Sequence, residues 1–359
     1  MKAAVCYEIG KPLVIEEIKL DPPKQGEVKV KMAATAICHS DIHFFKGELP
    51  GKLPFVAGHE SAGYVEEVGK GVTGFKPGDT VVISLMISCG KCKYCLTGRS
   101  HMCNAVWPMD TETRMHNKKG QDLAMILRTA SFADYTIVDQ SQLVKIPADM
   151  PLDRASLLAC GVITGFGAAV NRAKVKPMSS CVIIGVGGVG LNAVQGAAIS
   201  GAYPVIAVDI SDKKLQAAKI FGATHTVNSS KEDPVKKIQE LTGGGADYVF
   251  VTVGNVNAIV QGVAMSGPRG MTVIVGLPKF TDSLNLSPFS FIKDERVLTG
   301  GYMGSTQLHT EIPKLVALYK GGILKLDELI TARCRLDEIN KAIDLVVKGE
   351  ALRNVIVFK

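Results

Sequence analysis

The pattern of hydrophobic and polar positions changes near residue 147. Before it, short segments mix valines with charged residues, as in 27–33, and glycines and prolines separate these segments. This pattern is typical of half-buried strands joined by turns, and long helical periodicity is scarce. Residues 1–6 fit a first strand of the same kind. We therefore expect the first part of the chain to be rich in strands.

After residue 147 the chain alternates between apolar strands and helices. Residues 151–169 place small and apolar side chains at helical spacing, and an amphipathic segment runs from Asp212 to Phe221, before Gly222. Strands are expected at 181–184, 205–209, 226–228, 248–253, 272–275 and 297–302. Such alternation predicts a parallel sheet covered on both faces. The predicted fold class is therefore α/β, with a Rossmann-type doubly wound sheet beside a strand-rich domain.

The length of 359 residues predicts two domains. We place the strand-rich domain in 1–160 and the doubly wound sheet in 161–302, and we expect 303–359 to rejoin the first domain. Residues 107–127 read as a polar, irregular loop. Loops of that length are often functional or mobile.

Composition and charge narrow the class of protein. Hydrophobic residues make up 47% of the chain and charged residues 21%, which suits a globular protein with a real core. The net charge of +7 is scattered, so we expect no nucleic-acid partner. We find no segment of membrane-spanning apolar length and no signal-peptide core at residues 1–6. We therefore expect a cytoplasmic protein whose nine cysteines are metal ligands, catalytic groups or core residues.

A glycine-rich turn follows the strand at 181–184, and Asp209 ends the next strand. Glycines at such positions permit a tight turn of the backbone, close approach of a pyrophosphate, and close packing of the following helix on the strand. A carboxylate at 209 can accept the ribose hydroxyls of NAD and would repel the additional phosphate of NADP. The alternative is a glycine turn that binds no dinucleotide, which the agreement of strand, glycines and acid disfavours. The predicted NAD-binding residues are Gly185, Gly187, Gly188, Val189, Gly190 and Asp209.

Four cysteines lie within fifteen residues, at Cys89, Cys92, Cys95 and Cys103. Four thiolates can close a tetrahedral shell around zinc, which leaves no position for substrate. We therefore predict a structural zinc site in a lobe spanning 85–105. Disulfides are disfavoured by the expected compartment. An iron–sulfur cluster can also use four cysteines, and spacing alone does not exclude it.

A second set of metal-binding residue types is dispersed along the chain. Taken singly, each such cysteine or histidine is more often a core residue than a ligand. Together they resemble the zinc-containing alcohol dehydrogenases of the medium-chain family, in the same order over nearly the whole chain. The matching stretches are Cys38–His43, Gly58–Gly63, the four-cysteine lobe, Cys160-Gly161, Thr164-Gly165, the glycine turn, Val208-Asp209, Gly349-Glu350 and Arg353.

This resemblance implies a catalytic zinc ion bound by Cys38, His59 and Cys160, a ligand set of two cysteines and one histidine that is known from alcohol dehydrogenase. It implies that Asp41 holds the ring of His59 and that Glu60 can approach the metal. The strand-rich domain is then GroES-like. With the lobe, the chain would bind two zinc ions.

The resemblance also implies hydride transfer between an alcohol and NAD, which gives an aldehyde or ketone. Ser40 and His43 match the proton relay of the family, and His43 alone would read as a surface histidine. His39 stands where arginine is frequent and is expected to hold the cofactor pyrophosphate less firmly. Thr164 matches a further cofactor contact. Lys214 and Arg353 resemble cofactor contacts, with solvated surface charges as the alternative.

The substrate is less well defined. Leu85, Trp107, Ile126 and Leu127 are the predicted lining of the substrate pocket. An apolar wall discriminates weakly between alcohols, whereas the charged residues of 107–127 could recognise a polar or thiol-conjugated substrate.

Two other functions stay open at this point: reduction of a conjugated double bond, and a cofactor-binding protein without catalysis. Family members are dimers or tetramers, so we expect a homodimer joined at the edge strand Met271–Leu277, with a tetramer as the alternative.

Overall fold

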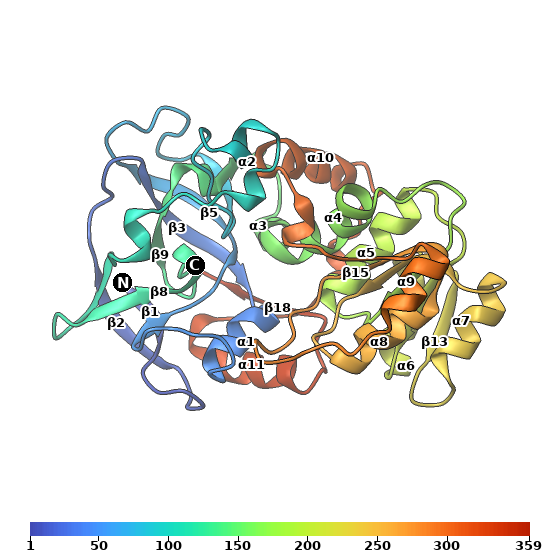
Figure 1. Cartoon of the computed structure of the whole chain (residues 1–359). Helices are drawn as coiled ribbons and strands as arrows, with labels where there is room; N and C mark the ends of the chain where they lie inside the picture. Colours follow the sequence, from blue (N-terminus) through green and yellow to red (C-terminus); the bar gives the residue numbers. More distant parts are fainter. The chain divides into compact units, whose positions relative to one another are not determined.

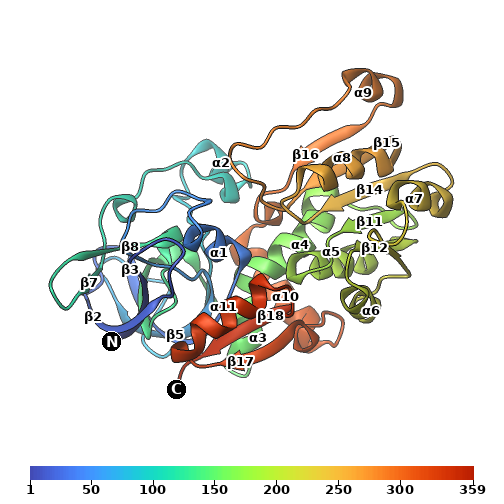
Figure 2. The same cartoon turned by 90° about the horizontal axis from the view of Figure 1, so that it is seen from below.

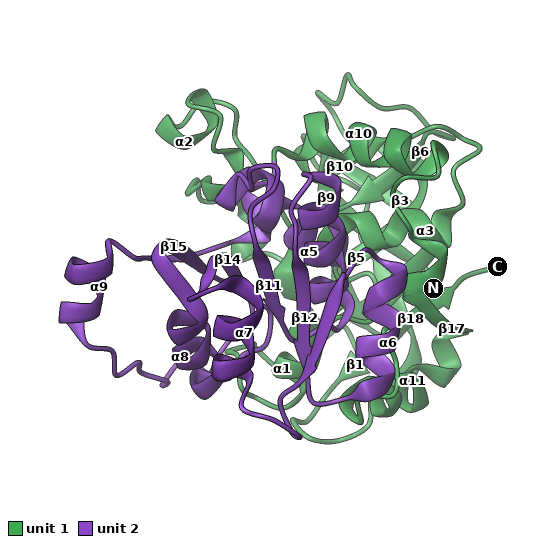
Figure 3. Cartoon of the chain, turned by 90° about the vertical axis from the view of Figure 1, so that its right-hand side faces the viewer, with its two compact units in different colours: residues 1–160, 307–359 green, residues 161–306 purple.

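The computed structural model describes all 359 residues, which form two compact units. One unit contains 1–160 and 307–359, and the other contains 161–306 (Figure 3). The C-terminal segment thus returns to the first unit at 307, four residues after the predicted position. Residues 303–306 stay with the second unit because they pack on α4 (Ile163–Gly167), where the Thr306 hydroxyl donates to the Ile163 carbonyl at 3.4 Å.

The first unit contains a closed barrel and a larger sheet, labelled in Figure 1. The barrel order is β1 (Lys2–Cys6), β2 (Val14–Leu20), β7 (Met115–Asn117), β8 (Asp122–Met125) and β4 (Phe55–Val56). Aromatic side chains belong to the hydrophobic cluster that contains the buried residues of these strands. The Phe45 and Phe55 rings stack with centroids 6.0 Å apart, and Phe132 lies 6.5 Å from Phe45.

The larger sheet brings the two ends of the chain together. Its order is β10 (Leu143–Lys145), β6 (Thr80–Ile83), β5 (Glu60–Val68), β3 (Glu27–Ala36), β18 (Arg353–Val357) and β17 (Ile330–Cys334), with β9 (Tyr135–Asp139) also paired to β3. β18 pairs antiparallel with β3 through Val355 and Ala36, so residues from the C-terminal segment complete the N-terminal sheet. The α-helices of this unit are α1 (His39–Phe45), α2 (Lys93–Leu96), α3 (Leu152–Leu157), α10 (Leu308–Lys320) and α11 (Ile339–Val347).

The second unit is the predicted parallel sheet. Its order is β13 (His225–Asn228), β12 (Val205–Asp209), β11 (Cys181–Ile184), β14 (Ala246–Val251), β15 (Ser266–Ile274) and β16 (Val297–Gly300). Every pairing is parallel, and the order is that of a Rossmann fold. Helices α5 (Gly188–Ile199), α6 (Asp212–Ile220), α7 (Pro234–Thr242) and α8 (Val256–Met265) connect the strands. The strands predicted at 181–184 and 205–209 are found with those bounds.

The prediction that Met271–Leu277 is the edge strand of this sheet is wrong. β15, which contains most of Met271–Leu277, lies between β14 and β16, and β16 is the strand at the edge. Between β15 and β16 the chain makes a long excursion through α9 (Pro288–Asp294), which Figures 2 and 3 show away from the sheet. The chain then returns parallel to β15 and adds a further strand outside it.

One long helix corrects our reading of apolar segments. Residues Leu152–Ala173 form a continuous helix of 22 residues with mean hydropathy 1.2, which by length and composition is enough to cross a membrane. However, 78% of its most apolar window is buried inside the protein, as in the core helix of a globular fold. Within it, wider π-helical turns at Leu158–Val162 and Ala168–Ala173 flank α4.

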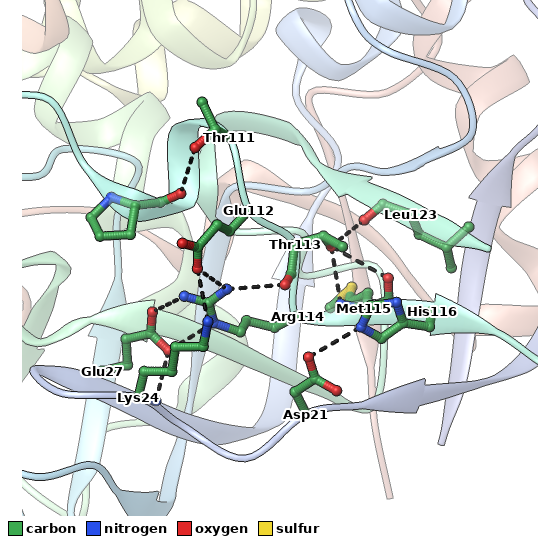
Figure 4. A network of polar contacts seen from close by, with 11 residues as sticks. Asp21, Lys24, Glu27, Thr111, Glu112, Thr113, Arg114, Met115, His116 and Leu123 are labelled. Atoms are coloured by element: carbon green, nitrogen blue, oxygen red, sulfur yellow. Dashed lines mark hydrogen bonds and ion pairs between the residues drawn. The ribbon is translucent and has the colours of Figure 1, made fainter. Parts of the chain in front are cut away.

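Residues 107–127 are not an irregular loop. They contribute β7 and β8, two strands of the closed barrel, and Arg114 is 1% exposed. Figure 4 shows its guanidinium in a bidentate pair with Glu27, through Nη2 to Oε1 at 2.6 Å and Nε to Oε2 at 3.0 Å. Glu112 accepts from Nη1 at 3.1 Å, and the His116 ring lies between Asp21 and Asp122. The partners of these charges at Asp21 and Glu27 are remote in sequence, which is why the segment read as a polar loop.

Removal of one partner of the buried pair should destabilise the first unit strongly. We expect Glu27→Gln to lower the free energy of unfolding by about 3–5 kcal/mol, since it removes the buried counter-charge of the Arg114 guanidinium and leaves only the half-exposed Glu112. Urea denaturation followed by circular dichroism measures this. The control is Glu112→Gln, which removes a half-exposed partner of the same arginine and should cost less than about 1 kcal/mol. Equal losses in both variants would contradict the central role of Glu27.

Candidate functional site

A buried carboxylate organises the first cluster of potential ligands. Asp41, in the first turn of α1, is 0% exposed. Its oxygens accept from the backbone N–H of Cys38 at 3.1 Å, the backbone N–H of Gly58 at 3.1 Å, and Nδ1 of His59 at 2.9 Å. Asp41 therefore ties the start of α1 to the segment that precedes β5. A glycine is required at 58, because φ is +98° and a Cβ would lie 2.7 Å from the Phe132 nitrogen.

Four buried side chains converge beside this carboxylate. The ligand atoms of Cys38, His59, Glu60 and Cys160 all lie within 4.8 Å of one another. Since Nδ1 of His59 donates to Asp41, its Nε2 is the nitrogen left for a ligand, and that buried atom has no hydrogen-bond partner. Cys160 lies in the π-helical turn Leu158–Val162, a local widening that is frequent at functional sites. Two thiols, one imidazole and a neighbouring carboxylate are a donor set that fits zinc.

The electrostatics of this cluster favour a cation. A hydrogen bond from Cys160, the charge of His59 and the charge of Arg353 hold the pKa of Cys38 well below its usual range, against the effect of burial. Burial lowers the pKa of His59, but the charges of Asp41 and Cys38 outweigh this and raise it well above its usual value. The cluster therefore concentrates negative charge in a dry site, where a metal ion can replace the proton on the histidine.

Arg353 lies against this cluster. It is 4% exposed, and its Nη1 is 3.3 Å from Oε1 of Glu60. Burial raises the pKa of Glu60 to about 8, although the charge of Arg353 acts in the opposite direction. The alternative of a solvated surface charge at Arg353 is therefore wrong. The sequence alone does not reveal this Glu60 partner, because the pairing depends on β18 joining the N-terminal sheet.

The two residues of the predicted proton relay lie on α1, next to the cluster. The Cys38 thiol approaches the Ser40 hydroxyl at 3.7 Å. His43 is in the last turn, and its Nδ1 lies 2.5 Å from Oε2 of Glu48. Sequence analysis missed Glu48. Glu48 is a carboxylate five residues after the histidine. This spacing predicts a contact only once it is known that α1 ends at Phe45 and that the chain reverses at Gly47.

The predicted lobe brings its four cysteines together. The ligand atoms of Cys89, Cys92, Cys95 and Cys103 lie within 4.8 Å of one another, and all four thiols are free, which excludes the disulfide alternative. Backbone N–H groups point at the sulfurs, as from Cys92 to Sγ of Cys89 at 3.3 Å and from Cys89 to Sγ of Cys103 at 3.4 Å. Hydrogen bonds, of which that from the backbone of Cys95 has the largest effect, lower the pKa of Cys92 to about 6. Burial and the hydrogen bond with Cys92 raise the pKa of Cys95 to about 12, so the contacts within the lobe favour the thiolate, the form that binds metal, at Cys92 and not at Cys95.

The glycine turn in the second unit has the geometry of a phosphate cradle. Gly185 has φ +85°, and a Cβ there would lie 2.3 Å from Cγ1 of Val253. A Cβ on Gly190 would lie 1.9 Å from the Gly185 carbonyl oxygen, so helix α5 packs too closely for any other residue. A Cβ on Gly187 would meet no atom within 4 Å, which leaves space over the N-terminus of α5. The turn therefore fits a dinucleotide.

Asp209 lies at the end of β12, beside this turn. One carboxylate oxygen accepts from the backbone N–H of Val186 at 2.9 Å, and the other accepts from Ser211 at 3.0 Å. Both hydrogen bonds orient the carboxylate at the carboxyl end of the sheet, where α/β folds bind ligands. Of the other cofactor residues, Gly188 and Val189 begin α5, Thr164 is 9% exposed in α4, Lys214 lies in α6, and His39 is exposed at the start of α1.

The residues predicted to line a substrate pocket are in different environments. Leu85, Trp107 and Leu127 are half-buried. Ile126 is 7% exposed and belongs to the hydrophobic core of the barrel. The charged side chains of 107–127 are engaged in ion pairs, including Arg128 with Asp110 and Lys118 with Glu17.

A strand-rich unit with a buried Cys2His cluster and a Rossmann unit with a glycine turn define a metal-dependent dehydrogenase. Residues 24–148 match the alcohol dehydrogenase GroES-like domain, and residues 188–321 match the zinc-binding dehydrogenase family. Alcohol dehydrogenase 1 of Trifolium repens is 40% identical, with 99% of this chain and 96% of that protein covered. Alcohol dehydrogenase class-P of Arabidopsis thaliana is 39% identical with the same coverage.

Solved structures agree with these relatives. The alcohol dehydrogenase zinc-binding domain protein from Burkholderia ambifaria superposes with a TM-score of 0.96 at 34% identity, with 100% of this chain and 98% of that chain covered. Benzyl alcohol dehydrogenase from Acinetobacter calcoaceticus gives 0.94 at 34% identity, with 100% and 99% covered. The chain belongs to the zinc-containing alcohol dehydrogenases and is a zinc-dependent alcohol oxidoreductase. The predicted family, fold class and enzyme class are confirmed, over the double-bond reductase and the non-catalytic protein.

Proposed function

We propose that the protein oxidises an alcohol with NAD, and reduces the matching aldehyde or ketone in reverse, at a catalytic zinc site formed by Cys38, His59 and Cys160. The observation that carries this proposal is the buried cluster in which Nε2 of His59 has no partner while two thiols lie within 4.8 Å. Zinc held there supplies a Lewis acid for the alcohol–carbonyl reaction. The four cysteines of the lobe hold a second, structural zinc ion, so each chain binds two.

The side chains around the cluster have separate tasks in this proposal. Asp41 keeps the proton of His59 on Nδ1, so Nε2 stays available as a ligand. Ser40 and His43 would take up the proton that the alcohol loses, and bound NAD would supply the hydride acceptor. Arg353, 3.3 Å from Glu60, favours the ionised form of that carboxyl against the effect of burial. The glycine turn binds the pyrophosphate, with His39, Thr164 and Lys214 as further cofactor contacts.

The substrate in this proposal is an alcohol with an apolar body. Support comes from the similarity to a benzyl alcohol dehydrogenase and from the apolar side chains of Leu85 and Leu127. A polar or thiol-conjugated substrate is disfavoured, because Arg114 and His116 already have carboxylate partners within the barrel. The free thiols of both clusters favour a reducing compartment, so we place the protein in the cytoplasm.

Metal analysis of cysteine variants tests the two zinc sites. We expect about two zinc ions per wild-type chain. Cys38→Ser should lose one of them together with alcohol-dependent NAD reduction, because it removes a ligand of the catalytic ion. Cys92→Ser is the matched variant in the lobe and should lose the other ion, with a lower thermal unfolding midpoint. Activity that survives Cys38→Ser would overturn the assignment of the catalytic site.

The cofactor preference depends on Asp209. We expect Asp209→Ala to lower kcat/KM for NAD by about 10- to 100-fold, the value of a lost hydrogen bond to a charged group. It should raise kcat/KM for NADP, since the repulsion of the additional phosphate disappears. Steady-state kinetics with both cofactors measures this. Asp212→Asn, at an exposed carboxylate three residues later, is the control. An unchanged ratio between the cofactors would refute the role of Asp209.

We also propose a homodimer, now through β16 rather than the strand predicted first. β16 is an unpaired sheet edge, and Val297 is 42% exposed. The neighbouring helix α9 exposes Phe289 by 70% and Ile292 by 78%, a degree of exposure that favours a protein partner. Ile292→Glu should weaken the dimer in sedimentation velocity, whereas Ile323→Glu, which is also exposed, should not. A wild-type monomer at micromolar concentration would exclude this proposal.

A further inference from the structure

The histidine of the proposed proton relay has a carboxylate partner that belongs to none of the motifs identified in the sequence. His43 is in the last turn of α1, and the chain reverses at Gly47, which has φ +70°. The backbone N–H of Glu48 then donates to the carbonyl of His43 at 2.9 Å. The Glu48 side chain lies alongside, with Oε2 2.5 Å from Nδ1 of His43. Main chain and side chain thus hold the two residues together.

The segment that carries Glu48 is anchored from outside. Gly10 donates its backbone N–H to the Phe45 carbonyl at 2.9 Å. A Cβ on Gly47 would lie 3.0 Å from Cγ2 of Ile9, so the turn rests against the loop that follows β1. The backbone position of Glu48 is therefore fixed by contacts with the loop that follows β1.

We propose that Glu48 is a positioning residue for His43, a role that rests on the proposed function of His43 as the end of the proton relay. A neutral imidazole carries one N–H, and the tautomer depends on the partner of each nitrogen. A carboxylate at Nδ1 holds the proton on that nitrogen and leaves the lone pair on Nε2. The ring is then oriented, and Nε2 is the acceptor for the arriving proton.

The proton balance is simple. The alcohol hydroxyl would lose its proton to the relay that begins at Ser40, and Nε2 of His43 would accept a proton at the end of that relay, so that both ring nitrogens carry hydrogen. The carboxylate of Glu48 would stabilise this imidazolium, and bound NAD would supply the hydride acceptor. The proton then leaves Nε2 for solvent, and the hydrogen on Nδ1 stays with Glu48. The logic is that of the carboxylate that orients the base in a catalytic triad.

A purely structural ion pair predicts a different outcome. The side chains of His43 and Glu48 are 27% and 30% exposed, and such a partly exposed pair contributes little to stability. The effect of Glu48 should therefore be found in the rate of proton-coupled hydride transfer and not in unfolding. The protein offers a matched pair outside the site, because Nδ1 of His116 lies 3.0 Å from Oδ1 of Asp122 in the barrel.

The test is the rate constant of NADH formation in a single turnover of the zinc-loaded enzyme with a saturating alcohol. We expect Glu48→Leu to lower it about 10-fold, part of the 10²–10⁴ that general base catalysis supplies. KM for the alcohol and the thermal unfolding midpoint should not change. Glu48→Gln keeps an acceptor for Nδ1–H and should restore most of the rate. Asp122→Asn, the control, should behave as wild type.

The same Glu48 substitution made in a His43→Gln variant distinguishes failure of this inference from failure of the proposed function. In His43→Gln, which should itself be slow, adding Glu48→Leu should have no further effect. If Glu48→Leu is as fast as wild type while His43→Gln is slow, the relay stands and the role of Glu48 is refuted. If Glu48→Leu slows both backgrounds equally, it does not act through His43 and the inference also fails. If His43→Gln is itself as fast as wild type, the relay fails and this inference with it.

Discussion

The hydrogen bonds of Asp41 are the constraint on which the buried cluster of Cys38, His59, Glu60 and Cys160 depends. A carboxylate with 0% exposure is costly to bury, and its cost is offset here by three donors, two backbone N–H groups and one imidazole. These donors come from the two segments that carry Cys38 and His59. One buried charge therefore closes the start of α1 onto the segment before β5 and sets the orientation of the His59 ring. The requirement for glycine at 58 follows from the same close approach.

A second buried charge, that of Arg114, also connects segments that are remote in sequence. The bidentate pair of Arg114 with Glu27 connects the residue before β7 to the start of β3. It joins the segment that forms β7 and β8 to the larger sheet of the same unit.

The two units reach their chemistry by different physical means. In the first, function depends on side chains of stated type, with soft sulfur and nitrogen donors gathered in a dry site. In the second, it depends on the absence of side chains, since three glycines allow a tight turn, open space above the helix start and close packing below. Substitution therefore acts differently in each. A cysteine variant removes a donor, whereas a glycine variant introduces a steric clash.

The sequence by itself determined the features that depend on local spacing. The four-cysteine lobe, the glycine turn before α5 and the strands at 181–184 and 205–209 are short-range patterns whose geometry follows from neighbouring residues. The dispersed residues Cys38, His59 and Cys160, which the structure brings into one cluster, were found only through a family resemblance. No local pattern links residues so far apart.

Only the tertiary structure decided which remote segments meet. It placed β16 outside β15, paired Arg114 with Glu27, buried Arg353 against Glu60, and set Glu48 beside His43. Each of these contacts depends on the topology of a sheet or on the direction of the chain after a turn. The pairing energy of two charges exists only once the fold has brought them together and removed the water between them, and that information is absent from the order of residues within either segment.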